Sequence, residues 1–127
     1  MNKELQNYGR SEPFTQFRIF ATIMNRLEKL QEFLAADPND SFTRYAIGLE
    51  YRSINDFQNA ISALEYVATN DPAYVATYYQ LAECYRRVDD NAKAKTIYLM
   101  GIAQAKKSND LHTMSELQMA MDELDEE

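Results

Sequence analysis

The chain repeats part of itself at a fixed interval. Asp37-Pro38 returns as Asp71-Pro72, and we call the spacing between these two pairs the repeat length. Shifting the sequence by one repeat length also brings identical residues together, in the pairs Thr43/Thr77, Tyr45/Tyr79, Tyr51/Tyr85, Arg52/Arg86, Asp56/Asp90 and Ala60/Ala94. A unit of this size that recurs at a constant spacing is typical of a solenoid, in which each unit covers the apolar face of the next.

Apolar residues recur at helical spacing within each interval, and turn residues separate the helical segments. Ser41 is the expected N-cap of the first helix of the central unit. Asp71-Pro72 is expected to end a helix, because proline disfavours the helical conformation of the residue before it. The sequence predicts six helices and no strand: residues 11–36, 41–53, a helix after Asp56 that ends near Thr69, residues 73–87, 91–107 and 111–124.

The residue types at fixed places in the two units identify the family. In the unit from Ser41, the seventh, eighth, eleventh, twentieth, twenty-fourth and closing places hold Ile47, Gly48, Tyr51, Ala60, Leu64 and Pro72. In the unit from Val75, the fourth, seventh, eighth, eleventh, twentieth and twenty-fourth places hold Tyr78, Leu81, Ala82, Tyr85, Ala94 and Tyr98. This pattern resembles the tetratricopeptide repeat. It departs from the family at three places. Arg44 replaces the aromatic residue at the fourth place, Val67 replaces the small residue at the twenty-seventh, and Lys106 replaces the second closing proline.

The resemblance implies an all-α fold, a right-handed superhelix of antiparallel helix hairpins with a capping helix at each end. Small residues at the eighth and twentieth places allow the two helices of a hairpin to approach closely. The expected organisation is a flexible N-terminus (1–10) and one domain (11–127). Its expected parts are a capping helix (11–36), two repeats (41–74 and 75–108), a C-terminal capping helix (109–124) and an acidic tail (122–127).

The start of the functional domain is open at this point. Met24 directly precedes the part of the first helix that best fits the repeat register. Residues 1–23 are therefore either part of the domain or an extension of it.

Composition narrows the class of protein. The net charge of −7 argues against binding nucleic acid, whose phosphates require a basic face. No apolar run is long enough to span a membrane, and the N-terminus has no secretory signal. We therefore expect a cytoplasmic protein that binds neither nucleic acid nor a membrane.

The residues that carry chemistry are scattered. His112 is the only histidine and Cys84 the only cysteine, and no motif surrounds either residue. The three glycines do not form a phosphate-binding loop. The sequence predicts a protein that is not an enzyme and that has no metal site and no cofactor.

In the tetratricopeptide family, the second, fifth, ninth and twelfth residues of each first helix line the concave side of the superhelix. The predicted peptide-binding residues, which we call the binding row, are Phe42, Tyr45, Leu49, Arg52, Tyr79, Glu83, Arg86 and Arg87, with Ala76 among them. Tyrosine and arginine are typical of binding surfaces. The alternative is that the tyrosines only fill the packing between adjacent units.

Two functions follow from these residues. The first is a module that holds an unidentified protein or peptide in its concave groove. Tyr45 and Leu49 replace the lysine and asparagine of the family's clamp for chaperone C-termini, so we expect a different ligand, such as an acidic or aromatic segment that meets the arginines. The second is self-association as a homo-oligomer through the helix of residues 14–34. The acidic segment Asp122 to Glu127 could also reach the arginines of a second copy.

Overall fold

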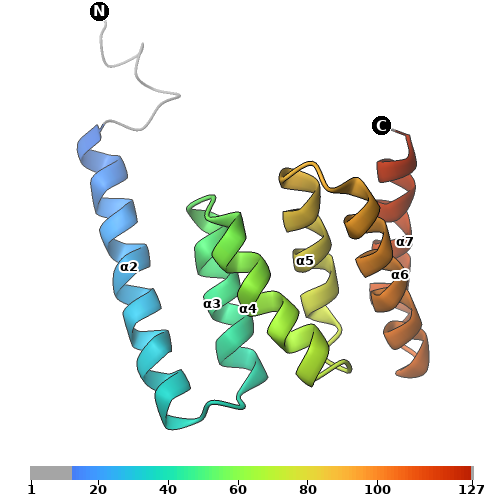
Figure 1. Ribbon diagram of the computed structural model, residues 1–127, viewed down its shortest axis with the longest axis horizontal. Coiled ribbons are helices and arrows are strands. Elements are labelled where there is room, and N and C mark those ends of the chain that lie inside the picture. Colours follow the sequence, from blue (N-terminus) through green and yellow to red (C-terminus); the bar gives the residue numbers. More distant parts are fainter. Residues whose placement is uncertain (1–12, 127) are drawn as a thin grey trace, which may run out of the picture.

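The computed structural model describes residues 13–126, which form six α-helices and no strand. The helices are α2 (Pro13–Ala36), α3 (Ser41–Ser53), α4 (Phe57–Asn70), α5 (Ala76–Arg87), α6 (Asn91–Lys107) and α7 (Leu111–Asp125). They follow one another across the molecule from α2 at one end to α7 at the other (Figure 1). Each helix packs mainly against its neighbours in the chain, with a smaller contact between α3 and α5. The predicted helical solenoid is confirmed.

Aspartates begin four of these helices. Asp40, Asp56, Asp90 and Asp110 each accept a hydrogen bond from a backbone N–H in the first turn of the helix that follows. This satisfies donors that have no partner inside the helix. The N-cap of α3 is Asp40, so the expectation for Ser41 was wrong. The hydroxyl of Ser41 instead donates to Asp71 across a distance of 2.6 Å.

The chain reverses direction inside each hairpin through a residue in the left-handed conformation. Asn55 and Asp89, which are separated by one repeat length, have φ angles of 62° and 63°, and Asn109 has a φ of 56° before α7. Asparagine and aspartate tolerate this conformation better than most residues with a side chain. The turn is therefore repeated along with the helices.

Helix α5 begins later than the sequence predicts. Residues 73–75 are not helical, because the chain turns at Pro72 and Ala73, where the N–H of Tyr74 donates to the carbonyl of Asp71 at 2.9 Å. The hydroxyl of Tyr78 donates to the carbonyl of Pro72 at 2.7 Å and ties this turn to α5. These hydrogen bonds stabilise the turn, and the spacing of apolar residues in the sequence does not reveal them.

Two apolar clusters hold the stack together. The larger joins α4, α5, α6 and α7, and its fully buried members include Leu64, Leu81 and Tyr98. The smaller joins α2 to α3 around Ile23, Leu27 and Ile47. No helix within residues 13–126 is both long enough and apolar enough to cross a membrane.

The two repeats differ at the fourth and twenty-seventh places, which face each other inside a hairpin. In the second unit a Cβ placed on Gly101 would lie 2.6 Å from the Cβ of Tyr78, so the buried tyrosine fits only beside a residue without a side chain. In the first unit Val67 is buried, and the guanidinium of Arg44 lies 3.6 Å from the ring centre of Tyr66. A hollow of about 200 Å³ remains beside Arg44 and Val67.

Candidate functional site

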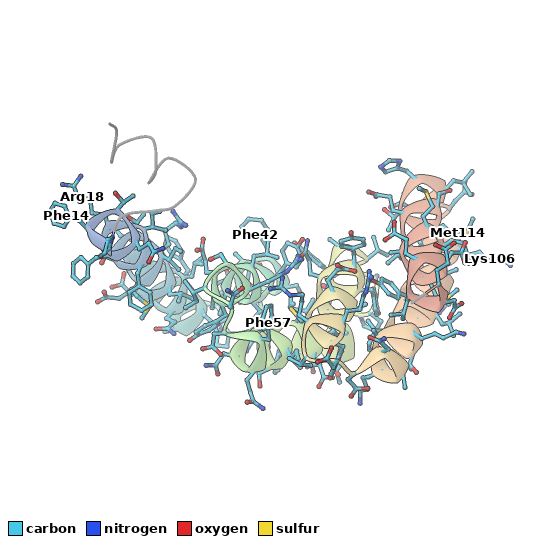
Figure 2. The ribbon with its side chains drawn as sticks, turned by 90° about the horizontal axis from the view of Figure 1, so that it is seen from above. Phe14, Arg18, Phe42, Phe57, Lys106 and Met114 are labelled. Atoms are coloured by element: carbon cyan, nitrogen blue, oxygen red, sulfur yellow. The ribbon has the colours of Figure 1, made fainter. Side chains whose placement is uncertain are left out.

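Helices α3, α5 and α7 lie on one side of the stack, and α4 and α6 lie on the other. Viewed from above, the ribbon curves gently, and Phe42 of α3 points to the side opposite Phe57 of α4 (Figure 2). We call the side that carries Phe42 the inner face. Phe42 is 64% exposed and Tyr79 is 38% exposed, whereas Tyr45 and Leu49 are half-buried.

Arg52 and Tyr45 help to join α3 to α5. The guanidinium of Arg52 donates to the side-chain oxygen of Gln80 in α5. The ring centre of Tyr45 lies 5.3 Å from that of Tyr74, in the turn before α5. Burial raises the pKa of Tyr45, and a side-chain hydrogen bond between Tyr45 and Gln80 opposes this shift. Tyr45 therefore packs between units and also borders the inner face.

Glu83 and Arg86 form a fixed pair on α5. Arg86 Nη1 lies 3.1 Å from Glu83 Oε2, and the same oxygen accepts a bond from the hydroxyl of Tyr98, which is fully buried in α6. Burial raises the pKa of Tyr98, and the bond to Glu83 raises it further. Arg86 Nη1 also lies 4.0 Å from Glu123 of α7. These side chains are positioned by one another before any ligand arrives.

Arg87 lies apart from the rest of the binding row. Its guanidinium carbon is 4.8 Å from the ring centre of Phe57, at the start of α4, and this contact draws it toward the second layer of helices. The structure thus brings together residues of the binding row from α3 and α5 but places Arg87 at the edge.

Helix α7 adds residues that the sequence reasoning missed. The cap that joins Asp40 to Thr43 recurs between Asp110 and Thr113, slightly more than two repeat lengths further along the chain. Helix α7 is therefore shifted from the register of the exact repeat, and Met119 takes the place that Leu49 has in the binding row. The Asp-x-x-Thr spacing could have revealed this shift from the sequence alone.

Between α5 and α7 the inner face is hollowed. The hollow has a volume of about 190 Å³ and is lined by Tyr79, Glu116, Met119, Ala120 and Glu123. Its most exposed apolar residue is Met119, at 66%.

The sole histidine and cysteine lie away from any common site. His112 is 85% exposed, and its Nε2 lies 3.3 Å from Glu116. Cys84 is fully buried in the core, and burial raises the pKa of its thiol. Residues 13–126 contain no group of three histidine, cysteine or acidic side chains that is arranged to hold a metal ion.

Comparison with known proteins gives a consistent result. A family model described as tetratricopeptide repeat matches residues 55–121. A tetratricopeptide repeat-containing protein of Pseudomonas aeruginosa is 25% identical over 99 residues, which cover 78% of this chain and 94% of the relative.

Solved structures extend the likeness. A tetratricopeptide repeat domain protein from Salinibacter ruber is 36% identical, with a TM-score of 0.66, over 69% of this chain and 89% of the other. PcrH, solved in complex with the chaperone-binding region of PopD, has a TM-score of 0.75 over 87% of this chain and 84% of its own. PcrH from Pseudomonas aeruginosa has also been solved. The match to the PcrH complex is 16% identical and shows the fold alone.

Proposed function

We propose that this chain, which belongs to the tetratricopeptide repeat family, binds a peptide or protein segment along its inner face. The observation that carries the proposal is that three successive inner-face helices each present an exposed apolar side chain: Phe42, Tyr79 and Met119. Large side chains that are exposed but held by a rigid helix suit recognition, because little conformational entropy is lost when they bind.

The similar proteins also support the binding of a protein segment. The fold is that of a protein-interaction module, and PcrH has been solved with a segment of another protein. Among the inner-face residues, the charged groups of α5 already have partners within the chain, whereas the apolar side chains do not fill the core. A ligand would therefore gain most from apolar contact, with polar groups setting its orientation.

Replacing Phe42 and Leu49 together by alanine is expected to weaken peptide binding by about tenfold or more, because both side chains lie on the inner face of α3. Short random peptides displayed on phage would be selected on the wild-type protein, and the affinity of the selected peptides would be measured by fluorescence anisotropy. Phe42 is exposed, so its removal should leave the fold intact.

The matched control replaces Leu99 and Met100 by alanine, because these residues are 50% and 44% exposed on α6, in the other layer. Selected peptides that bind both variants as tightly as the wild type would show that the inner face is not the binding site.

One observation favours a second function, self-association through α2. The side chains of Phe14, Phe17, Phe20 and Met24 are between 42% and 69% exposed. Arg18 is the only charged residue between Pro13 and Asn25. The N-terminal half of this helix stands clear of α3 in Figure 1. An exposed apolar surface of this kind marks an interaction site.

The repeat register explains why α2 is uncovered. Ala60 and Leu64 of α4 lie against Gly48 of α3, and Val67 lines a hollow together with Arg44 of α3. One repeat length earlier, the places of Ala60, Leu64 and Val67 hold Arg26, Leu30 and Phe33. Val67 is 1% exposed, but Phe33 is 59% exposed, since no described helix precedes α2. A second copy of the chain could take the place of the missing partner.

If α2 mediates self-association, replacing Phe17 and Phe20 by serine should convert an oligomer into a monomer. The measurement is sedimentation velocity over a wide range of protein concentration, with Leu99→Ser as the control for an exposed apolar residue elsewhere. A wild-type protein that stays monomeric at the highest concentration would exclude this function and leave the binding proposal unaffected.

A further inference from the structure

We propose that the hollow between α5 and α7 selects a segment in which a lysine or arginine lies next to a large apolar residue. The inference rests on the proposed function and names the chemistry of the partner at one part of the inner face. The sequence-based expectation was an acidic or aromatic segment, and the inference departs from its acidic alternative because of the contacts that the arginines make.

The arginines of the binding row already have partners. Arg52 donates to Gln80, and Arg86 lies beside Glu83. An acidic ligand would have to compete with these contacts and would meet the carboxylate of Glu83 beside Arg86. The arginines are therefore poorly placed to attract negative charge.

The charged residues that line the hollow are acidic. Two of its five lining residues are glutamates, Glu116 and Glu123, and none is basic. Glu116 lies 3.3 Å from His112 Nε2, and Glu123 lies 4.0 Å from Arg86 Nη1. The two glutamate side chains are nevertheless 56% and 68% exposed, so both stay open to a ligand, whereas the side chain of Arg86 is 19% exposed. Asp122 follows on the same helix, with its carboxylate 2.9 Å from Gln118. Carboxylates around an open hollow favour a cationic group and disfavour an anionic one.

The centre of the hollow supplies the apolar contact. Tyr79 lines the hollow, and its ring packs against that of Tyr98, with ring centres 6.5 Å apart and the ring planes inclined at 65°. Met119 is flexible and polarizable, so it can fit aliphatic and aromatic side chains of different shapes. The volume is smaller than a typical small-molecule pocket of about 300 to 1,000 Å³. One side chain of a peptide fits this description better than a cofactor does.

The test compares peptides selected from a random displayed library on the wild-type protein. We expect the selected sequences to share a lysine or arginine adjacent to leucine, methionine or phenylalanine. The double substitution Glu116→Gln and Glu123→Gln should weaken a selected peptide by about five- to tenfold, because it removes two charges while keeping the shape of the side chains. Raising the salt concentration should weaken binding to the wild type more than to this variant.

The matched control is the double substitution Glu28→Gln and Glu32→Gln, which removes two exposed charges from α2. It should bind as the wild type does, since those residues lie on another helix. The melting temperatures of all variants should be compared, because Glu123 lies near Arg86.

Two results separate this inference from the function on which it rests. The inference would be overturned by peptides whose binding depends on Phe42 and Leu49 but that are acidic, or that bind equally well without the charges of Glu116 and Glu123. That result would leave the proposed binding along the inner face intact. Peptides indifferent to both sets of substitutions would overturn both.

Discussion

Replacing Leu81 by alanine is expected to lower the free energy of unfolding by about 3 kcal/mol, within the range of roughly 2 to 5 kcal/mol for leucine in a packed core. Leu81 is fully buried on α5, in the cluster that joins α4 to α7. Removing its side chain leaves a cavity in the middle of the stack, where helices on both sides are held by other contacts. Urea denaturation followed by circular dichroism measures the change.

Leu99→Ala is the matched control, because this leucine is 50% exposed on α6. Its substitution should change the unfolding free energy by less than about 1 kcal/mol. Equal effects at the two positions would mean that α5 is not the centre of the core.

Replacing Gly101 by valine is expected to destabilise the protein by about 2 to 3 kcal/mol. A Cβ at this position would lie 2.6 Å from the Cβ of Tyr78 and 2.9 Å from a methyl group of Leu117. The Tyr78 atom is attached directly to the backbone of α5, so it cannot move without moving the helix. The expected result is a lower melting temperature, measured by differential scanning calorimetry.

Ala103→Val is the control that places the same branched side chain in α6 without a clash, because Ala103 is exposed slightly further along this helix. Its effect should stay near about 0.5 kcal/mol. If Gly101→Val were no more damaging than this control, the close packing of α6 on α5 would be wrong.

The sequence predicted the helical stack well because spacing and residue type are repeated. Ala82 and Ala94 are fully buried in one cluster. A Cβ on Gly48 would lie 3.5 Å from the carbonyl oxygen of Ala60 and only 2.7 Å from Leu64. The tightest neighbour of Gly48 is thus the leucine, although the small residues do permit the approach.

The fit of Tyr78 against Gly101 was not predicted, even though the twenty-seventh place of the repeat falls on Gly101. The family pattern assigns a packing role to Gly48 at the eighth place, but none was assigned to Gly101 from the sequence. The start of α5 was missed for another reason: local hydrogen bonds decide where a helix begins, and apolar spacing does not report them.

For the candidate site, the sequence indicated which residues share a face but not what their side chains contact. Arg87 follows Arg86 directly, yet it lies against Phe57, because adjacent residues on a helix point about 100° apart. Met119 and its glutamates were missed because the places that line the concave side were read only in the two full units, although α7 begins with the same Asp-x-x-Thr cap as α3. The binding row itself stays a prediction until binding is measured.

The order in which the helices touch also has a kinetic consequence. Nearly every contact joins neighbours in the chain, so few long loops must close before the core forms, and folding should be fast for a protein of this size. Among the described helices, α2 packs mainly against α3, and the bond between Arg26 and Glu50 at 2.8 Å joins the same two helices. Opening of the native state should therefore begin at α2 and travel inward, while the pairing of α5 with α6 persists longest.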